Sequence, residues 1–195
     1  MIWAVILAAG KSERMGTAKL LLPWKRKTII ETVVKDALES GADKVLVVLG
    51  ANADKIKKKI NEYSVKTVVN RNYPRGMLSS VQTAFQALPS DVRAAIIMLG
   101  DQPAASSSII NKLIKAFRTS GKGIVLPVLR TKRGHPVLID LKYRDEVIDL
   151  PAEIGLRELI HRHPEDILEV PVRTRSIFQD IDRPEDYRQA VKPKE

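Results

Sequence analysis

The sequence predicts an α/β fold of the Rossmann-like, doubly wound type with a mostly parallel sheet. Short apolar runs, typical of parallel strands that are buried on both faces, alternate with segments whose apolar residues recur at helical spacing. The predicted strands are residues 3–7, 45–49, 65–69, 94–99 and 124–128, and all of them except 65–69 are continuous apolar runs. The 195 residues contain no repeat, low-complexity linker or break in composition, so a single domain over residues 1–195 is expected.

The first apolar run leads directly into a loop of small residues and cations. Backbone N–H groups of residues with little or no side chain can approach a ligand closely, and neighbouring cations favour an anion. The small residues are Ala8, Ala9 and Gly10, and the cations are Lys11, Arg14 and Lys19. The spacing fits neither the Walker loop nor the G-x-G-x-x-G fingerprint. An ordinary strand-to-helix turn with surface cations is the alternative interpretation.

The segment over residues 20–63 predicts an extended piece, a turn and two helices. Residues 20–23 are expected to be extended, and residues 24–27 form a basic turn. Thr28 and Glu31 have the spacing of a capping box, which predicts a helix start, and Gly41 ends the helix. Residues 53–63 predict a second helix. Its lysines occupy the solvated face because its isoleucines recur at helical spacing.

Residues 70–80 are expected to be a loop that leads into the next helix. Gly76 permits close approach of the backbone to a ligand. Ser79 and Ser80 place two hydroxyl groups at the helix N-terminus, where they can donate to a ligand. Capping of the helix alone explains one serine but not two.

An aspartate follows the apolar run at residues 94–99. Asp101 comes after Gly100, and in a parallel sheet the carboxyl end of that run opens onto the same crevice as the Gly10 loop. A carboxylate is a hard oxygen ligand that suits Mg²⁺ held jointly with phosphate oxygens. The alternative is an aspartate that only makes a turn.

The remaining residues predict further alternation. A helix is expected from residue 106 to about Gly121, followed by the strand at 124–128, a basic loop at 130–133 and a turn at Gly134–Pro136 into a strand. Helical spacing resumes at residue 141, and short strands are expected at 167–170 and 177–179. Pro184 predicts the start of a last helix, for which Asp182 or Arg183 is the N-cap.

Composition excludes several functional classes. The net charge of +10 suits anionic ligands, but aromatic residues make up only 5% of the chain, so a base-stacking surface for nucleic acid is not expected. No cysteine is present and there are three histidines, which leaves carboxylates as the metal ligands. No run approaches the length of a membrane span and no leader is recognised, so a cytoplasmic protein without membrane association is expected.

Ordered motifs across nearly the whole chain resemble those of one family. They are L-A-A-G-x-S-x-R-M-G followed by Lys19, then R-G-M-x-S-S, G-D-Q-P, G-x-P-V and D-I-D-x-P-E-D-Y. Together they resemble the nucleotidyltransferases related to the molybdenum-cofactor enzymes, which are similar in turn to the sugar-nucleotide pyrophosphorylases. The resemblance implies the nucleotide-diphospho-sugar transferase type of fold and a Mg²⁺-dependent reaction.

The resemblance also implies roles for individual residues. Arg14, Lys19 and Asp101 are implied as catalytic residues, and Asp101 and Asp182 as metal ligands. Gly134, His135 and Pro136 are implied to bind the acceptor, although a lone histidine beside Gly and Pro is more often positional. The implied nucleotide-binding residues are Leu7, Ala8, Ala9, Gly10, Arg14, Lys19, Asn70, Gly76, Ser79, Ser80, Gly100 and Asp101.

The implied reaction is transfer of CMP from CTP to the phosphate of molybdopterin or the molybdenum cofactor, with release of pyrophosphate. CTP is favoured because the loop resembles the cytidylyltransferase branch, whereas the guanylyltransferase branch has Gly in place of Ala9. One alternative is a related transferase that uses GTP or another acceptor, such as a sugar phosphate or cobinamide phosphate. Another is a non-catalytic chaperone that delivers cofactor to a molybdenum hydroxylase client.

Overall fold

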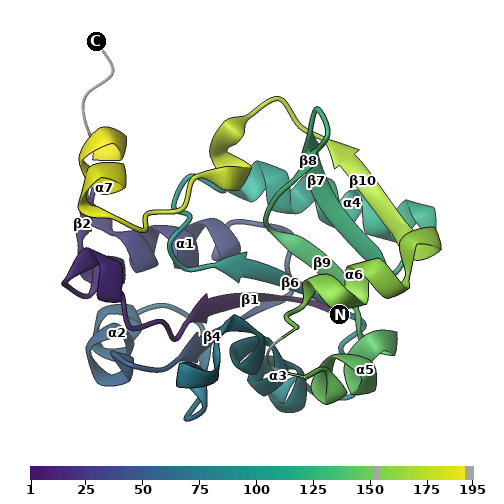
Figure 1. The fold of residues 1–195 in the computed structure, drawn as a ribbon, viewed down its shortest axis with the longest axis horizontal. Coiled ribbons are helices and arrows are strands. Elements are labelled where there is room, and N and C mark those ends of the chain that lie inside the picture. The colour runs from purple at the N-terminus through teal and green to yellow at the C-terminus, as the bar shows by residue number, and fades with distance from the viewer. Residues whose placement is uncertain (152–153, 192–195) are drawn as a thin grey trace.

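The computed structural model describes residues 1–151 and 154–191 (Figure 1). Its strands are β1 (Ile2–Ala8), β2 (Pro23–Trp24), β3 (Lys27–Thr28), β4 (Lys44–Leu49), β5 (Lys66–Val69), β6 (Ala94–Leu99), β7 (Ile124–Leu129), β8 (Lys132–Arg133), β9 (Val137–Asp140) and β10 (Ile167–Pro171). The central sheet has the order β10-β7-β9-β6-β1-β4-β5, and β8 pairs with β7 outside this path. Strands β2 and β3 form a separate antiparallel pair.

The central sheet is mostly parallel, which confirms the predicted fold class. Strand β1 lies between β4 and β6 and is parallel to both. Leu7, near the carboxyl end of β1, is in register with Val48 of β4 and Leu99 of β6. Strand β9 runs antiparallel to both of its neighbours, β6 and β7. The ends of β1, β4 and β6 therefore meet at one edge of the sheet, where parallel sheets form ligand crevices.

Helices cover both faces of the sheet (Figure 1). The α-helices are α1 (Ile29–Leu38), α2 (Ala53–Ile60), α3 (Met77–Ala87), α4 (Ser107–Ser120), α5 (Arg144–Asp149), α6 (Arg157–Arg162) and α7 (Pro184–Val191). The 3₁₀ turns are η1 (Glu13–Met15), η2 (Lys19–Leu21), η3 (Tyr73–Arg75), η4 (Leu141–Tyr143), η5 (Pro164–Asp166) and η6 (Arg175–Phe178). None of the helices in the described part of the chain has the length and apolar character needed to span a bilayer.

Burial on both faces explains the continuous apolar runs. On one face, Ala4 and Ile6 of β1 pack in a cluster with residues of α1, α2 and α4. On the other face, Trp3 and Val5 pack with residues of α3, α5 and α6. Because successive side chains of a strand point to opposite faces, a polar residue at any position inside β1 would be buried without water.

The first helix begins as predicted. Thr28 Oγ1 accepts from the backbone N–H of Glu31, and the Glu31 carboxylate accepts from the backbone N–H of Thr28. Both halves of the capping box are therefore present, which satisfies two backbone donors at the start of α1. The next helix is shorter than predicted, since α2 ends at Ile60 rather than at residue 63.

Three local predictions were wrong. Residues 20–23 are not one extended piece, because the chain makes the turn η2 before β2 begins. The basic segment 130–133 is not a plain loop, because Lys132 and Arg133 pair with β7 as strand β8. Residues 177–179 do not form a strand. The preceding Thr174 accepts from Ser176 N–H and starts the turn η6 instead.

Candidate active site at the carboxyl edge of the sheet

A cleft of about 500 Å³ opens at the carboxyl ends of β1 and β6. The loop after β1 forms one wall, and η3 with the start of α3 forms another. Nine of the site residues predicted from the sequence line it, namely Leu7, Ala9, Gly10, Arg14, Lys19, Gly76, Ser80, Asp101 and Asp182. Segments far apart in the sequence therefore converge on one cleft, as the parallel topology requires.

Glycines bring the loop and the neighbouring strand ends into close contact. Gly100 N–H donates to Leu7 O, and a Cβ at position 100 would lie 2.8 Å from that oxygen. A Cβ at position 50 would lie 2.4 Å from Ala9 O and 2.7 Å from Ala9 Cβ. Both positions thus require glycine. Gly100 does not line the cleft but allows Asp101, which follows it, to lie beside the loop.

The side chains of Lys19, Asp101 and Asp182 form an ion cluster in the cleft. Lys19 Nζ lies 2.5 Å from Asp101 Oδ2 and 2.8 Å from Asp182 Oδ1. Arg14 Nη1 lies 2.9 Å from Asp182 Oδ2. The Lys19 side chain is only 12% exposed, so its charge is poorly hydrated and is balanced mainly by the two carboxylates.

The charges of this cluster reinforce one another. Burial disfavours the charged form of Lys19, but the carboxylates of Asp101 and Asp182 outweigh burial and raise the pKa of Lys19 above its ordinary value. The hydrogen bond from Lys19 lowers the pKa of Asp182 against a smaller opposing effect of burial, and Arg14 lowers it further. Lys19 and Asp182 are therefore both charged at neutral pH.

The carboxylate of Asp182 does not cap the last helix. Asp186 Oδ2 accepts from the backbone N–H groups of Asp182 and Arg183 at the start of α7. The Asp182 side chain instead bonds to Lys19 and Arg14. Among the described residues the Asp182 side chain makes no bond to the first turn of α7, and Arg183, the other predicted cap, directly precedes the helix.

Asn70, Ser79 and Ser80 form a buried polar group beside the cleft. Asn70 Nδ2 donates to Ser79 Oγ at 2.9 Å and to Ser80 Oγ at 3.0 Å. Asn70 and Ser79 do not themselves line the cleft, whereas Ser80 does. Gly76, with φ of 101°, turns the chain into α3, a conformation that other residues rarely adopt. A direct contact with nucleotide remains a prediction for all four residues.

Gly134, His135 and Pro136 lie outside the residues that line this cleft. His135 N–H donates to Ile177 O, and a Cβ at position 134 would lie 2.6 Å from that oxygen, so η6 supports the segment. Burial lowers the pKa of His135, while Asp180 and Asp101 act in the opposite direction. Acceptor binding by this segment stays a prediction.

Comparison with known proteins gives the family. The family model described as the MobA-like NTP transferase domain matches residues 4–167. This chain belongs to the MobA-like NTP transferase family. The predicted resemblance is thereby confirmed, and the chain is a nucleotidyltransferase of this family.

Two relatives and two solved structures are similar to this chain. The chain is 28% identical over 184 residues to the molybdenum cofactor cytidylyltransferase of Escherichia coli (strain K12), covering 94% of this chain and 92% of the relative. It is 30% identical over 188 residues to nicotine blue oxidoreductase of Paenarthrobacter nicotinovorans, covering 93% of this chain and 92% of the relative. The crystal structure of Rv0371c from Mycobacterium tuberculosis H37Rv matches with a TM-score of 0.88 and 26% identity, covering 97% and 96%. Another structure of Rv0371c is a complex with manganese and matches at 24% identity with a TM-score of 0.83, covering 97% of each chain.

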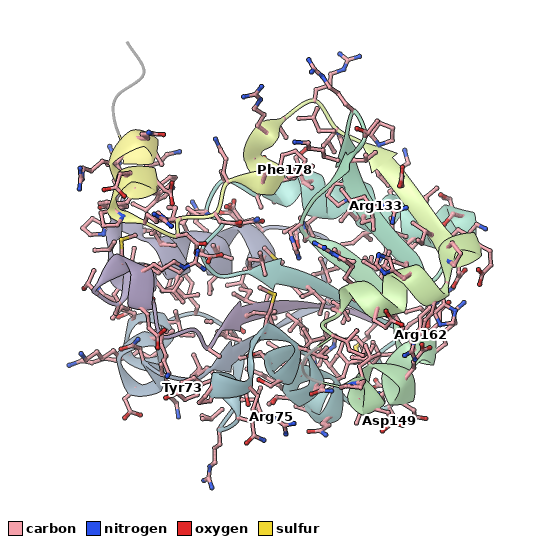
Figure 2. All side chains as sticks on the ribbon, viewed as in Figure 1. Tyr73, Arg75, Arg133, Asp149, Arg162 and Phe178 are labelled. Carbon is pink, nitrogen blue, oxygen red and sulfur yellow. The ribbon has the colours of Figure 1, made fainter. Side chains whose placement is uncertain are left out.

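Eight residues that line the cleft of this MobA-like transferase were not among the predicted site residues, namely Lys11, Ser12, Glu13, Leu20, Tyr73, Pro74, Met77 and Leu99. Tyr73, Pro74 and Met77 line the cleft on the side of η3 and α3. Figure 2 shows Tyr73 on this side of the molecule, and Met77 is 58% exposed. The sequence signal was the placement of Met77 directly after Gly76, where a core residue is not needed.

The carboxylates fit a divalent cation that arrives with phosphate. No cluster of three or more His, Cys, Asp or Glu suited to a metal is present in residues 1–151 and 154–191. Mg²⁺ is commonly held by one or two carboxylates together with substrate phosphates and water, rather than by an all-protein cage. Asp101 and Asp182, joined by one ammonium group, match that donor set.

Proposed function

We propose that this chain transfers CMP from CTP to the phosphate of molybdopterin or its molybdenum form and releases pyrophosphate. The observation that carries the proposal is the convergence of the Gly10 loop, Lys19, Asp101 and Asp182 on one cleft. The similarity to the cytidylyltransferase of E. coli over 94% of the chain supports this choice of reaction. Ala9, where the guanylyltransferase branch has Gly, supports CTP over GTP.

The reaction requires positioning and charge neutralisation more than proton transfer. An oxygen of the acceptor phosphate forms a bond to the α-phosphorus of CTP while the bond from that phosphorus to the bridging oxygen of the β-phosphate breaks. Because the acceptor is already an anion, no general base is needed. Lys19 and Arg14 would supply the positive charge. Gly10 lines the cleft, so backbone N–H groups near it would donate to phosphate oxygens.

Asp101 and Asp182 are the residues that would hold a divalent ion. When bound, the ion would polarise phosphate oxygens and stabilise the charge that develops on pyrophosphate. Both carboxylates are bonded to Lys19. If Lys19 moved its hydrogen bonds to the triphosphate, the two carboxylates would be free to bind the ion. Mg²⁺ is the expected ion. Manganese, present in a complex of the M. tuberculosis protein, is the alternative to test.

A pyrophosphate-release assay tests the proposal. CTP, GTP and ATP are each supplied with Mg²⁺, with and without molybdopterin, and sugar phosphates replace molybdopterin in a parallel series. Release that requires both CTP and molybdopterin is expected. Release with a different nucleotide or acceptor would reassign the substrates, and no release in any combination would reject transferase activity. Consumption of a reduced nicotinamide nucleotide is measured in parallel because one relative is an oxidoreductase.

A further inference from the structure

The buried polar group of Asn70, Ser79 and Ser80 limits where the Ser80 hydroxyl can donate its proton. Asn72 N–H donates to Asn70 Oδ1 at 2.8 Å. A backbone N–H can only donate, so this contact identifies the oxygen of the Asn70 amide and leaves its nitrogen pointing to the serines. Asn70 is only 2% exposed, and its backbone N–H is bonded to Leu49 O, so the side chain is held in place.

The amide of Asn70 makes both serine hydroxyls hydrogen-bond acceptors. Its two N–H groups point to Ser79 Oγ and Ser80 Oγ. Each hydroxyl still carries one proton to donate. Ser79 donates its proton to Gly76 O at 2.7 Å. Ser80 Oγ donates to no acceptor among residues 1–151 and 154–191, and Ser80 is one of the residues that line the cleft.

We infer that Asn70 is a positioning residue for nucleotide selection, because it occupies one lone pair of Ser80 Oγ and leaves the hydroxyl proton for the base. The inference rests on the proposed function, since it concerns the nucleotide half of the same site. A donor at this place favours a base edge that offers an acceptor. Cytosine offers two acceptors, O2 and N3, beside one amino group on its pairing edge, whereas guanine offers one acceptor, O6, beside N–H groups at N1 and N2.

The opposite polarity would follow from one isosteric change. In Asn70→Asp the atom that faces the serines becomes a carboxylate oxygen, which can only accept. Ser80 would then donate to this carboxylate and present its lone pair to the cleft. The added negative charge weakens binding of every nucleoside triphosphate, so the informative quantity is the ratio of CTP affinity to GTP affinity.

Calorimetric titration of wild type, Asn70→Asp, Ser80→Ala and the double variant with CTP and with GTP tests the inference. In Asn70→Asp the CTP-to-GTP affinity ratio is expected to fall about tenfold or more, the effect of one mismatched buried hydrogen bond. In the Ser80→Ala background the same change should leave the ratio unaltered, because Asn70 acts through Ser80. A purely structural role would lower both affinities with and without Ser80.

Two results would overturn the inference. One is an unchanged ratio in Asn70→Asp, and the other is a full effect of Asn70→Asp in the absence of Ser80. If Asn70→Asp does not fold, Asn70→Ala takes its place with and without Ser80→Ala. It also removes the amide that occupies a lone pair of Ser80, so it should lower the ratio only when Ser80 is present. Failure of the proposed function is separate. It would appear as no nucleotide binding, or no preference for CTP, in the wild-type chain.

Discussion

Replacement of Asp101 by Asn separates catalysis from stability. The amide keeps the size of the carboxylate and one oxygen that can accept from Lys19, but it loses the charge. Lys19 retains Asp182 as a partner at 2.8 Å. The free energy of unfolding should therefore fall by only about 1 kcal/mol, the order of one weakened charge-assisted hydrogen bond. Loss of a metal ligand should slow transfer about a thousandfold, equivalent to about 4 kcal/mol of transition-state stabilisation.

The assay combines pyrophosphate release from CTP and molybdopterin with urea denaturation. Asp43→Asn is the matched control, because Asp43 Oδ2 accepts from Ile2 N–H at 2.6 Å at the opposite edge of the sheet. It should show a similar small loss of stability and full turnover. Near-normal turnover in Asp101→Asn would refute the reasoning, and so would an unfolded Asp101→Asn protein, since Asp101 would then be structural.

Four further predictions concern charge, pH, loop packing and nucleotide binding. Lys19→Met leaves two carboxylates without their shared cation, so urea denaturation should show a loss of about 1–3 kcal/mol that added Mg²⁺ reverses. Burial alone would raise the pKa of Asp166, but hydrogen bonds from Lys142 and Tyr143 lower it to about 2. Since this folded-state pKa lies below the unfolded value, stability present above about pH 4 is lost as the pH falls towards 2, and thermal melts of Asp166→Asn should show a shallower loss. Gly50→Ala should destabilise the protein by about 1–3 kcal/mol, because its Cβ would lie 2.4 Å from Ala9 O. Gly10→Ala meets nothing within 4 Å among the described residues and should lower CTP affinity at unchanged stability, as measured by titration and denaturation.

Strand ends and the cleft could be predicted from the sequence because they follow from local pattern and topology. Continuous apolar runs identify strands buried on both faces, and parallel pairing brings their carboxyl ends to one edge. Leu7 and Leu99 are in register in β1 and β6, so the residues that follow them had to lie close together. The capping box of Thr28 and Glu31 could also be predicted from local pattern, since the two residues are only three positions apart.

Contacts between distant residues were beyond local pattern. The partners of Lys19 include Asp182, which is 163 residues away, and no spacing rule relates the two. Contact of Asn70 with nucleotide stays a prediction, and its hydrogen bonds to the two serines, nine and ten residues away, were not predicted. Asp186 accepts from the backbone N–H groups of Asp182 and Arg183, while the Asp182 carboxylate bonds to Lys19 and Arg14, and the local pattern does not show this division of partners.

The most direct test of the account is a crystal structure of the chain with CTP and Mg²⁺. The account predicts the triphosphate against the Gly10 loop, Mg²⁺ between phosphate oxygens and the carboxylates of Asp101 and Asp182, and Lys19 turned towards the phosphates. A nucleotide bound in this cleft with its phosphates remote from Asp101, or bound elsewhere on the protein, would contradict it.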